Sequence, residues 1–359
     1  MSFYYFHCFP SDFPLEDTME IGARLEASGC LVPGFIPPPV GLLDLRGLIY
    51  CQEIDQRTII VLPDRNLASR MAQVARYGAP VEESAAGRVA VDLMAFCQAM
   101  DINFEPSIAF HELASLRGNL EAHQELAWFR AADNAAGREW IDLACGRRSR
   151  VQLGEPDVPK SSDLAFPLRR WRRNYIVALK IAELELTTMQ PLQKFLTLAE
   201  WMWNDFMIAG SAALYAATYF APNAMKKGLF KQLRSADRTR ALEGAKNAAW
   251  DMTHLSEFVA RVGRAEEKRE RVIFATADMG LARIAPMTMA APTETSDQAP
   301  LKSLLNGWTA SDADAILDVL AKFFNLDGQR ERPPPRTGTN VIEDMTREGE
   351  QIVLDWSAQ

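Results

Sequence analysis

The feature that most constrains the fold of this chain is a short apolar run that follows a helical pattern and ends in an acid. Within residues 247–262 the apolar side chains recur at steps of three and four, at Ala249, Met252, Leu255, Phe258 and Val259. This spacing is the period of an amphipathic helix. After a charged turn, residues 272–275 predict a buried strand that leads directly to Thr276 and Asp278. A helix, a strand and an acid at the strand's carboxyl end are typical of the ligand-binding edge of an open α/β sheet.

A second stretch of the same kind lies nearer the N-terminus. Residues 58–62 predict a strand, Asp64 and Asn66 follow it, and a helix is expected from Leu67 onward. Residues 45–54 predict another strand, joined to the first by a polar turn in a β-hairpin. The sequence therefore predicts that Asp64 and Asp278 lie at strand ends of one α/β active-site edge.

The length of the chain and its composition along the sequence predict an α/β domain interrupted by helices. At 359 residues the chain can form two domains, or one domain with a large insertion. A connector rich in Gly, Pro, Ser and Asp ends near residue 167. The helical patterns lie at residues 91–100, 106–131, 168–186, 191–207, 208–220 and 311–324. The tail that includes residues 330–335 is expected to be mobile.

Charge and cysteine usage exclude several classes of protein. The net charge of −8 argues against a protein that coats nucleic acid with its whole surface, but it permits local basic faces. The five cysteines show no paired spacing and the N-terminus lacks a secretion signal, so we expect reduced thiols and a cytoplasmic protein. Residues 206–225 carry no formal charge, yet their Gly, Pro and Asn favour a buried helix over a membrane span.

Several common catalytic motifs are missing from the sequence. It contains no glycine-rich phosphate loop, no dinucleotide fingerprint and no nucleophile elbow. The pair His111-Glu112 starts like a zinc-protease helix, but Ser115 stands where the second histidine is required. With four histidines and no cysteine pair, the sequence also disfavours a structural zinc site.

The candidate site is instead a set of four carboxylates. Its members are Asp64 and Asp278 at strand ends, and Glu112 and Asp251 on helices. Carboxylate oxygens are the ligands that Mg²⁺ and Mn²⁺ prefer, and clustered acids repel one another unless a cation lies between them. Glu121 and Glu125 are alternatives to Glu112, because they lie on the same predicted helix. Each acid by itself is more often a helix cap, a surface charge or an ion-pair partner.

The order of these acids resembles that of the PIN-like nuclease superfamily. The resemblance rests on Asp64 with Asn66 after the first strand, Glu112, Asp251 and the Thr276-Ala277-Asp278 strand end. It covers roughly residues 56–135 and 240–285. It implies an α/β/α sandwich with a mostly parallel central sheet, in which Mg²⁺ or Mn²⁺ bound by the four acids promotes attack of water on RNA or other flexible nucleic acid. Asn66 and Thr276 would orient the ligands by hydrogen bonds.

Two basic segments provide candidate nucleic-acid contacts. The first consists of Arg169, Arg170, Trp171, Arg172 and Arg173, and the second includes Lys226 and Lys227. Arginines around a tryptophan combine phosphate-binding charge with a stacking surface. A charged and solvated helix start explains the first segment equally well.

These observations predict a metal-dependent endoribonuclease with five sections. They are an N-terminal β-containing extension (1–55), the first part of the PIN-like domain (56–150), a helical insertion (151–240), the second part of the domain (241–290), and a C-terminal helix with a mobile tail (291–359). The alternatives are a PIN-like module that binds nucleic acid or a protein without cutting, and a helical scaffold whose acids are structural. A protein inhibitor and a homo-oligomer remain open as partners, and no membrane is expected.

Overall fold

The chain divides into two compact units. The computed structural model describes residues 9–79, 84–158, 162–223, 229–290, 299–325 and 332–357, apart from 335, 337 and 339, and the side chains of 299 and 300 are not described. Unit 1 consists of Met1–Phe166 and Ala260–Ala282, and unit 2 of Pro167–Val259 and Arg283–Gln359. The chain passes between the units after residues 166, 259 and 282. The first division coincides with the end of the connector near residue 167, while the sections predicted from the sequence end at residues 150, 240 and 290.

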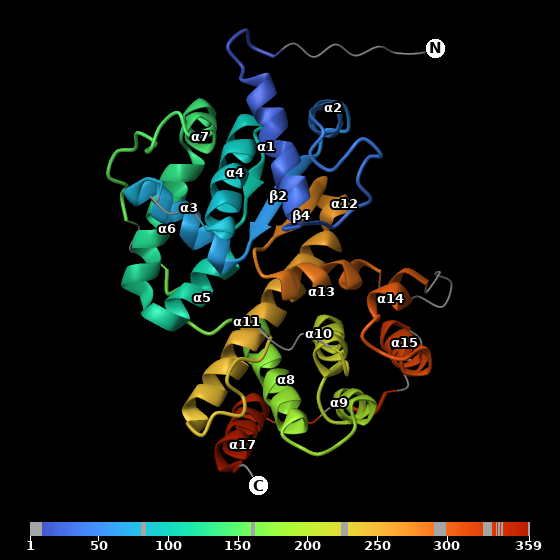
Figure 1. Ribbon diagram of the computed structural model, residues 1–359. Helices are drawn as coiled ribbons and strands as arrows, with labels where there is room; N and C mark the ends of the chain where they lie inside the picture. The colour runs from blue at the N-terminus through green and yellow to red at the C-terminus, as the bar shows by residue number, and fades with distance from the viewer. Residues whose placement is uncertain are drawn as a thin grey trace. The chain divides into compact units, whose positions relative to one another are not determined.

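Unit 1 contains a sheet of four strands in the order β1-β4-β2-β3. The strands are β1 (Leu31–Pro33), β2 (Thr58–Pro63), β3 (Asn103–Phe104) and β4 (Glu270–Ala275). β2 runs parallel to both β3 and β4, and the short edge strand β1 is antiparallel to β4 (Figure 1). Unit 1 is therefore an α/β structure with a mixed sheet.

Helices of unit 1 pack around this sheet and on one another. They are α1 (Leu15–Ser28), α2 (Leu45–Ile49), α3 (Arg65–Tyr77), α4 (Ala85–Ala99), α5 (Ser107–Arg117), α6 (Asn119–Asp133), α7 (Gly137–Ala144) and α12 (Ala265–Lys268). α4 is the central helix of the group, since it packs on α7, α1 and α3. Ten of its fifteen residues are buried. A helix that is apolar almost all round requires neighbours on most sides, which these three helices supply.

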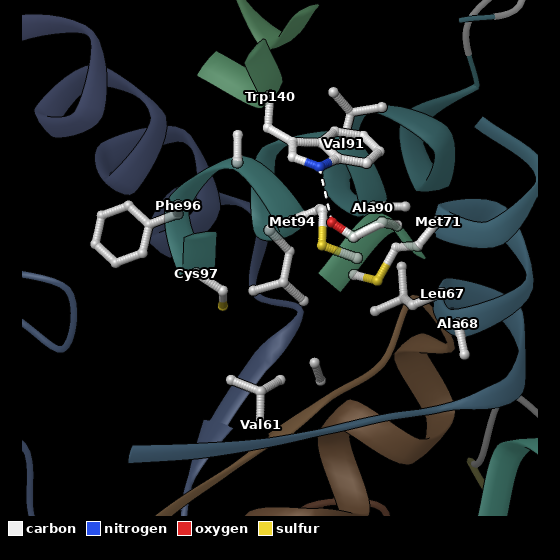
Figure 2. Close-up of a cluster of buried hydrophobic side chains, with 14 of the residues drawn as sticks. Val61, Leu67, Ala68, Met71, Ala90, Val91, Met94, Phe96, Cys97 and Trp140 are labelled. Carbon is white, nitrogen blue, oxygen red and sulfur yellow. Dashed lines mark hydrogen bonds between the residues drawn. The ribbon is translucent and has the colours of Figure 1, made fainter. Parts of the chain in front are cut away.

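The core of unit 1 is built around Trp140 of α7. Its indole is fully buried and its Nε1–H donates to the carbonyl oxygen of Ala132 at 3.0 Å, so no donor is lost on burial (Figure 2). Met71 of α3 and Met94 of α4 belong to the same cluster (Figure 2). Val61 is a member of this cluster and lies on β2. Because the side chains of a strand point alternately to the two faces of a sheet, Val61 packs this core against one face of the sheet.

The hairpin predicted at residues 45–62 is wrong. Residues 45–49 form α2, and residues 50–54 continue it as one wide turn with π-helical hydrogen bonds. Asp44 caps α2, because its carboxylate accepts a hydrogen bond from the backbone N–H of Gly47 at 3.1 Å. Leu45, Leu48 and Ile49 are buried, and their three- and four-residue spacing is that of a helix. The apolar content of the segment was typical of a strand, but its period and its cap determine the structure.

The single helix predicted over residues 106–131 is divided at Gly118. Gly118 has φ 88°, a backbone conformation that glycine adopts readily because it lacks a Cβ. It separates α5 from α6, and the two helices pack against each other. As a result, α5 and α6 each present carboxylates of their own to α3.

The described part of unit 2 contains helices and no strand. They are α8 (Arg169–Glu185), α9 (Pro191–Asn204), α10 (Gly210–Phe220), α11 (Arg238–Val262, in unit 2 as far as Val259), α13 (Met279–Met289, in unit 2 from Arg283), α14 (Ala299–Leu304), α15 (Ala310–Phe324) and α17 (Val341–Asp355). The uncharged stretch at residues 206–225 includes α10, which is largely buried. Across the described residues, no helix is both long enough and apolar enough to span a membrane.

The mobile tail predicted at the C-terminus is wrong for residues 341–355. They form α17, which packs along α8 (Figure 1). The Tyr175 hydroxyl donates to the Glu350 carboxylate at 2.7 Å, and Val353 is fully buried. Arg332 is also fixed, because its guanidinium donates to backbone carbonyls of residues 202, 203 and 206. The polar composition of this segment predicted mobility. The buried side chains Met345 and Val353 and the hydrogen bonds of Glu350 and Arg332 instead hold it in place.

Candidate active site at the strand ends of unit 1

The sheet register brings two of the predicted acids to the same edge. β2 and β4 are parallel, and Pro63 pairs with Ala275 as the last residue of each strand. Asp64 and Thr276 are the next residues along the chain, so both lie at the carboxyl ends of neighbouring strands. Such an edge is where open α/β sheets bind ligands.

Asp64 is fixed by hydrogen bonds from both sides. Its side chain is only 3% exposed and caps α3, because Oδ1 accepts from the backbone N–H of Leu67 at 2.8 Å. Oδ2 accepts from the Thr276 hydroxyl at 2.6 Å. These donors stabilise a buried carboxylate and hold it in one orientation.

Thr276 connects Asp64 to Asp278. Its oxygen accepts a hydrogen bond from the backbone N–H of Asp278 at 3.0 Å while its proton is donated to Asp64. The Asp278 carboxylate is half-buried and uses Oδ1 to cap α13, with donors at Gly280 (2.7 Å) and Leu281 (3.3 Å). Within the described residues nothing donates to its Oδ2. Asp278 therefore combines a capping oxygen with an oxygen that is available to a ligand.

The helical acid Glu112 is held by Arg65, a residue that the sequence analysis did not select. Glu112 is 8% exposed, and its Oε1 accepts from the Arg65 Nε at 2.8 Å. Arg65 is the first residue of α3, where a positive charge is unfavourable because the helix dipole is positive at that end. A basic residue at the start of a helix was thus a signal in the sequence that an acid lies nearby. Because Arg65 directly follows Asp64, this ion pair holds Glu112 near the strand-end edge.

The two alternatives to Glu112 lie on α6 and differ in their surroundings. Glu121 forms an ion pair with Arg117 at 2.5 Å at the surface. Glu125 faces Ser69 of α3, and burial raises the pKa of its carboxyl group even though the Ser69 hydrogen bond and the Arg117 charge lower it. Its Oε1 is buried with no hydrogen-bond partner in the described structure. The arginine link favours Glu112 as the helical acid of the strand-end edge.

The remaining predicted residues are placed as follows. Asn66 is exposed on the first turn of α3. Asp251 lies on α11 in unit 2, where its Oδ2 is 3.2 Å from the Tyr215 hydroxyl. That hydroxyl also lies 2.8 Å from the carbonyl oxygen of Leu229. Convergence of Asp251 with the acids of unit 1 stays a prediction.

A divalent cation fits this edge only with a small number of protein ligands. Among the described residues no three His, Cys, Asp or Glu side chains are grouped so that they could hold a metal ion. Mg²⁺ in proteins is commonly held by one or two carboxylates, with water and substrate phosphate as the other ligands. Asp64 and Asp278 supply two carboxylates at one edge, and Oδ2 of Asp278 is available. The predicted set of four acids stays a prediction.

In unit 2 the first basic segment forms the start of α8. Arg170 forms an ion pair with Glu257, and Arg172 with Glu343. The Trp171 indole stacks on Tyr175, with ring centroids 5.0 Å apart, and lies 5.5 Å from Trp250. The tryptophan predicted to stack on bases thus has aromatic partners within unit 2. Lys226 and Lys227 lie outside the described residues.

Comparisons with known proteins identify no relative of this chain. No family model matches it, and no curated protein or solved structure shows significant similarity to it. Function therefore has to be inferred from the residues of this chain.

Proposed function

We propose that the chain is a metal-dependent nuclease that hydrolyses phosphodiester bonds in RNA, with its reacting groups at the strand-end edge of unit 1. The observation that carries this proposal is the Asp64–Thr276–Asp278 arrangement at the ends of two parallel strands. The PIN-like resemblance supplies the substrate class, and the two carboxylates supply the cation chemistry.

Asp64 and Asp278 would hold a Mg²⁺ or Mn²⁺ ion. Such an ion lowers the pKa of a bound water and balances charge on phosphate oxygens. Thr276 positions both acids, since its hydroxyl bonds the carboxylate of Asp64 and the backbone of Asp278. Because both acids are fixed by backbone and hydroxyl donors, little reorganisation is needed when a substrate binds.

Arg65 and Glu112 would act beside this pair. Arg65 is partly exposed and held at the edge by Glu112, at 2.8 Å. A guanidinium in this position can donate two hydrogen bonds to a phosphate and orient it against the acids. Exchange of the Glu112 carboxylate for a phosphate would place that phosphate on the Arg65 guanidinium, beside the two acids.

The test is cleavage of an end-labelled single-stranded RNA with Mg²⁺ or Mn²⁺, beside the same reaction in EDTA. Asp278→Asn keeps a good helix cap but removes the charge, so we expect normal folding and a loss of cleavage of about 100-fold or more. Asp44→Asn is the matched control, since Asp44 also caps a helix of unit 1 but lies at no strand end. Cleavage that persists in EDTA, or in Asp278→Asn at the parental rate, excludes the proposal.

The ion pair between Arg65 and Glu112 favours a second candidate, a module that binds nucleic acid without cutting. A positive charge at the edge reduces the need for a cation, and no described group of three acids requires one. This candidate predicts RNA binding that is unaffected by Mg²⁺ and no cleavage by the parent. Thermal melting with and without Mn²⁺ distinguishes the two, because a cation that binds the folded state raises the melting temperature.

A further inference from the structure

Unit 2 contains a pocket of about 350 Å³ at the first turns of α8. Its walls include residues of α8 and of the segment that connects α9 to α10. The residues that matter here are Arg169, Arg173, Asn174, Met207, Ile208 and Ala209. The pocket thus has a basic side and an apolar side.

The basic side contains two arginines that have no acidic partner among the described residues. Arg170 and Arg172 have acidic partners, in Glu257 and Glu343. Arg169 and Arg173 form neither an ion pair nor a hydrogen bond with any residue that the structure describes. Burial and the neighbouring charge of Arg169 lower the pKa of Arg173, so the two guanidinium groups repel one another inside the pocket.

The backbone adds to this positive potential. α8 begins at Arg169, and its cap residue Leu168 has no side chain that can accept the first free N–H groups. The positive end of the helix dipole therefore lies beside two arginines, which is unfavourable for both. An anion in the pocket would offset the repulsion between the two arginines, accept hydrogen bonds from the free N–H groups and balance the positive end of the helix dipole. Arg173 and Arg169 lie one helical turn apart, so both can reach one anion.

The lining residues between α9 and α10 suit an apolar group next to the anion. Met207 and Ile208 are half-buried and line the pocket. The backbone N–H groups of residues 207–209 have no hydrogen-bond partner in the described part of the chain. Asn174 is already engaged, because its amide donates to Thr253 at 3.1 Å. The lining therefore offers backbone donors and apolar surface next to the two arginines.

We propose that this pocket binds the phosphate group of a nucleotide, either free or within a nucleic-acid strand. Arginine binds phosphate in a forked, bidentate geometry, and Met207 and Ile208 offer apolar surface to the sugar or base attached to it. Arg170 also lines the pocket but is paired with Glu257, so the proposal assigns phosphate recognition to Arg169 and Arg173. The proposal concerns residues of unit 2 and does not depend on cleavage.

The test measures binding in EDTA, so that no cleavage takes place. The full chain is titrated with a fluorescent single-stranded RNA that carries a 5′-phosphate, and then with inorganic phosphate and a nucleoside 5′-monophosphate as competitors. In the variant with both Arg169→Gln and Arg173→Gln we expect RNA affinity to fall by about tenfold or more, since charge-assisted hydrogen bonds are lost. Arg172→Gln is the matched control on the same helix, and we expect its affinity within about twofold of the parent.

The competitors identify the source of the phosphate. Competition by the monophosphate at concentrations well below those of inorganic phosphate indicates a free nucleotide, and competition by unlabelled RNA only indicates a strand. Without ligand the double variant is expected to melt at or above the parental temperature, because charge repulsion is removed. If it fails to fold, Ile208→Glu places an acid in the pocket without changing α8 and should weaken binding equally. Parental affinity in these variants, or an equal loss in Arg172→Gln, overturns the proposal.

Discussion

Thr276 is the residue on which the geometry of the strand-end edge depends. It is fully buried, donates to Asp64 and accepts from the backbone of Asp278. Thr276→Val keeps the shape but removes both hydrogen bonds, so we expect a loss of about 1–3 kcal/mol in the free energy of unfolding. Thr276→Ser keeps the hydroxyl and should cost less than Val. Urea denaturation measures both, and a Val variant as stable as the Ser variant contradicts the role of the hydroxyl.

Asp133 provides a pH-dependent test of burial in unit 1. It ends α6 and accepts a hydrogen bond from the Gln98 side chain at 2.8 Å, and burial raises its pKa from 3.8 to about 6. Because the folded state holds this proton more tightly, its contribution to stability is complete below the unfolded pKa and is lost as pH rises through 6.

We therefore expect Asp133→Asn to melt at a higher temperature than the parent at neutral pH, with a difference that disappears near pH 4. Asp355→Asn is the control for helix-end charge, since Asp355 ends α17 but is exposed. A gain in the Asp133 variant that is equal at both pH values would mean that helix-end charge, and not burial, causes the effect.

Among the secondary-structure elements, β2 and β4 are each followed by an acid that caps the next helix. β2 leads into α3 through Asp64, and β4 leads into α13 through Asp278, and each acid caps the helix it precedes. Capping and ligand binding are compatible, because a carboxylate can accept more than one hydrogen bond. Each carboxylate satisfies backbone N–H groups in the first turn of its helix, which would otherwise lack a partner. The same sequence thus serves folding and the proposed chemistry.

The packing of α17 on α8 leads to a prediction about a glycine. A Cβ on Gly349 would come within 2.9 Å of the Cβ of Leu179, and neither atom can rotate away. Ala is better than Gly in a helix by about 1 kcal/mol, but overpacking costs typically about 1–3 kcal/mol. We expect Gly349→Ala to lower the free energy of unfolding, while Gln351→Ala at an exposed site of the same helix should not. A more stable Gly349→Ala would show that α17 is not packed closely on α8.

At the scale of the whole molecule, the acidic net charge restricts how nucleic acid can be bound. The charge of −8 repels phosphate at long range, and salt screens this repulsion beyond about 8 Å at physiological ionic strength. Binding must therefore come from local positive groups that have no acid beside them. Arg169 and Arg173 in unit 2 meet this condition, whereas Arg65 in unit 1 is paired with Glu112.

Elements with a clear hydrophobic period or a clear end could be predicted from the sequence alone. Strand β4 with Thr276 and Asp278 was predicted from an apolar run and the acid that follows it, and β2 with Asp64 in the same way. Helices α8, α9, α10 and α15 were predicted within a few residues, because their apolar faces repeat every three or four positions. Local hydrogen bonding and side-chain period act over a few residues and can be read in order along the chain.

Tertiary structure decided everything that depends on contacts between distant residues. Residues 45–49 are helical because Leu45, Leu48 and Ile49 pack into the core of unit 1, and α17 is ordered because it packs on α8. The pairing of Arg65 with Glu112 joins residues 47 positions apart, and the pairing of Thr276 with Asp64 joins residues 212 positions apart. Arg170 and Arg172 are paired with Glu257 and Glu343, which lie on two other helices. The sequence of residues 169–173 alone therefore does not show which of its arginines lack an acidic partner. Charge balance in a folded chain is a property of neighbours in space, and neighbours in space are fixed only when the chain has folded.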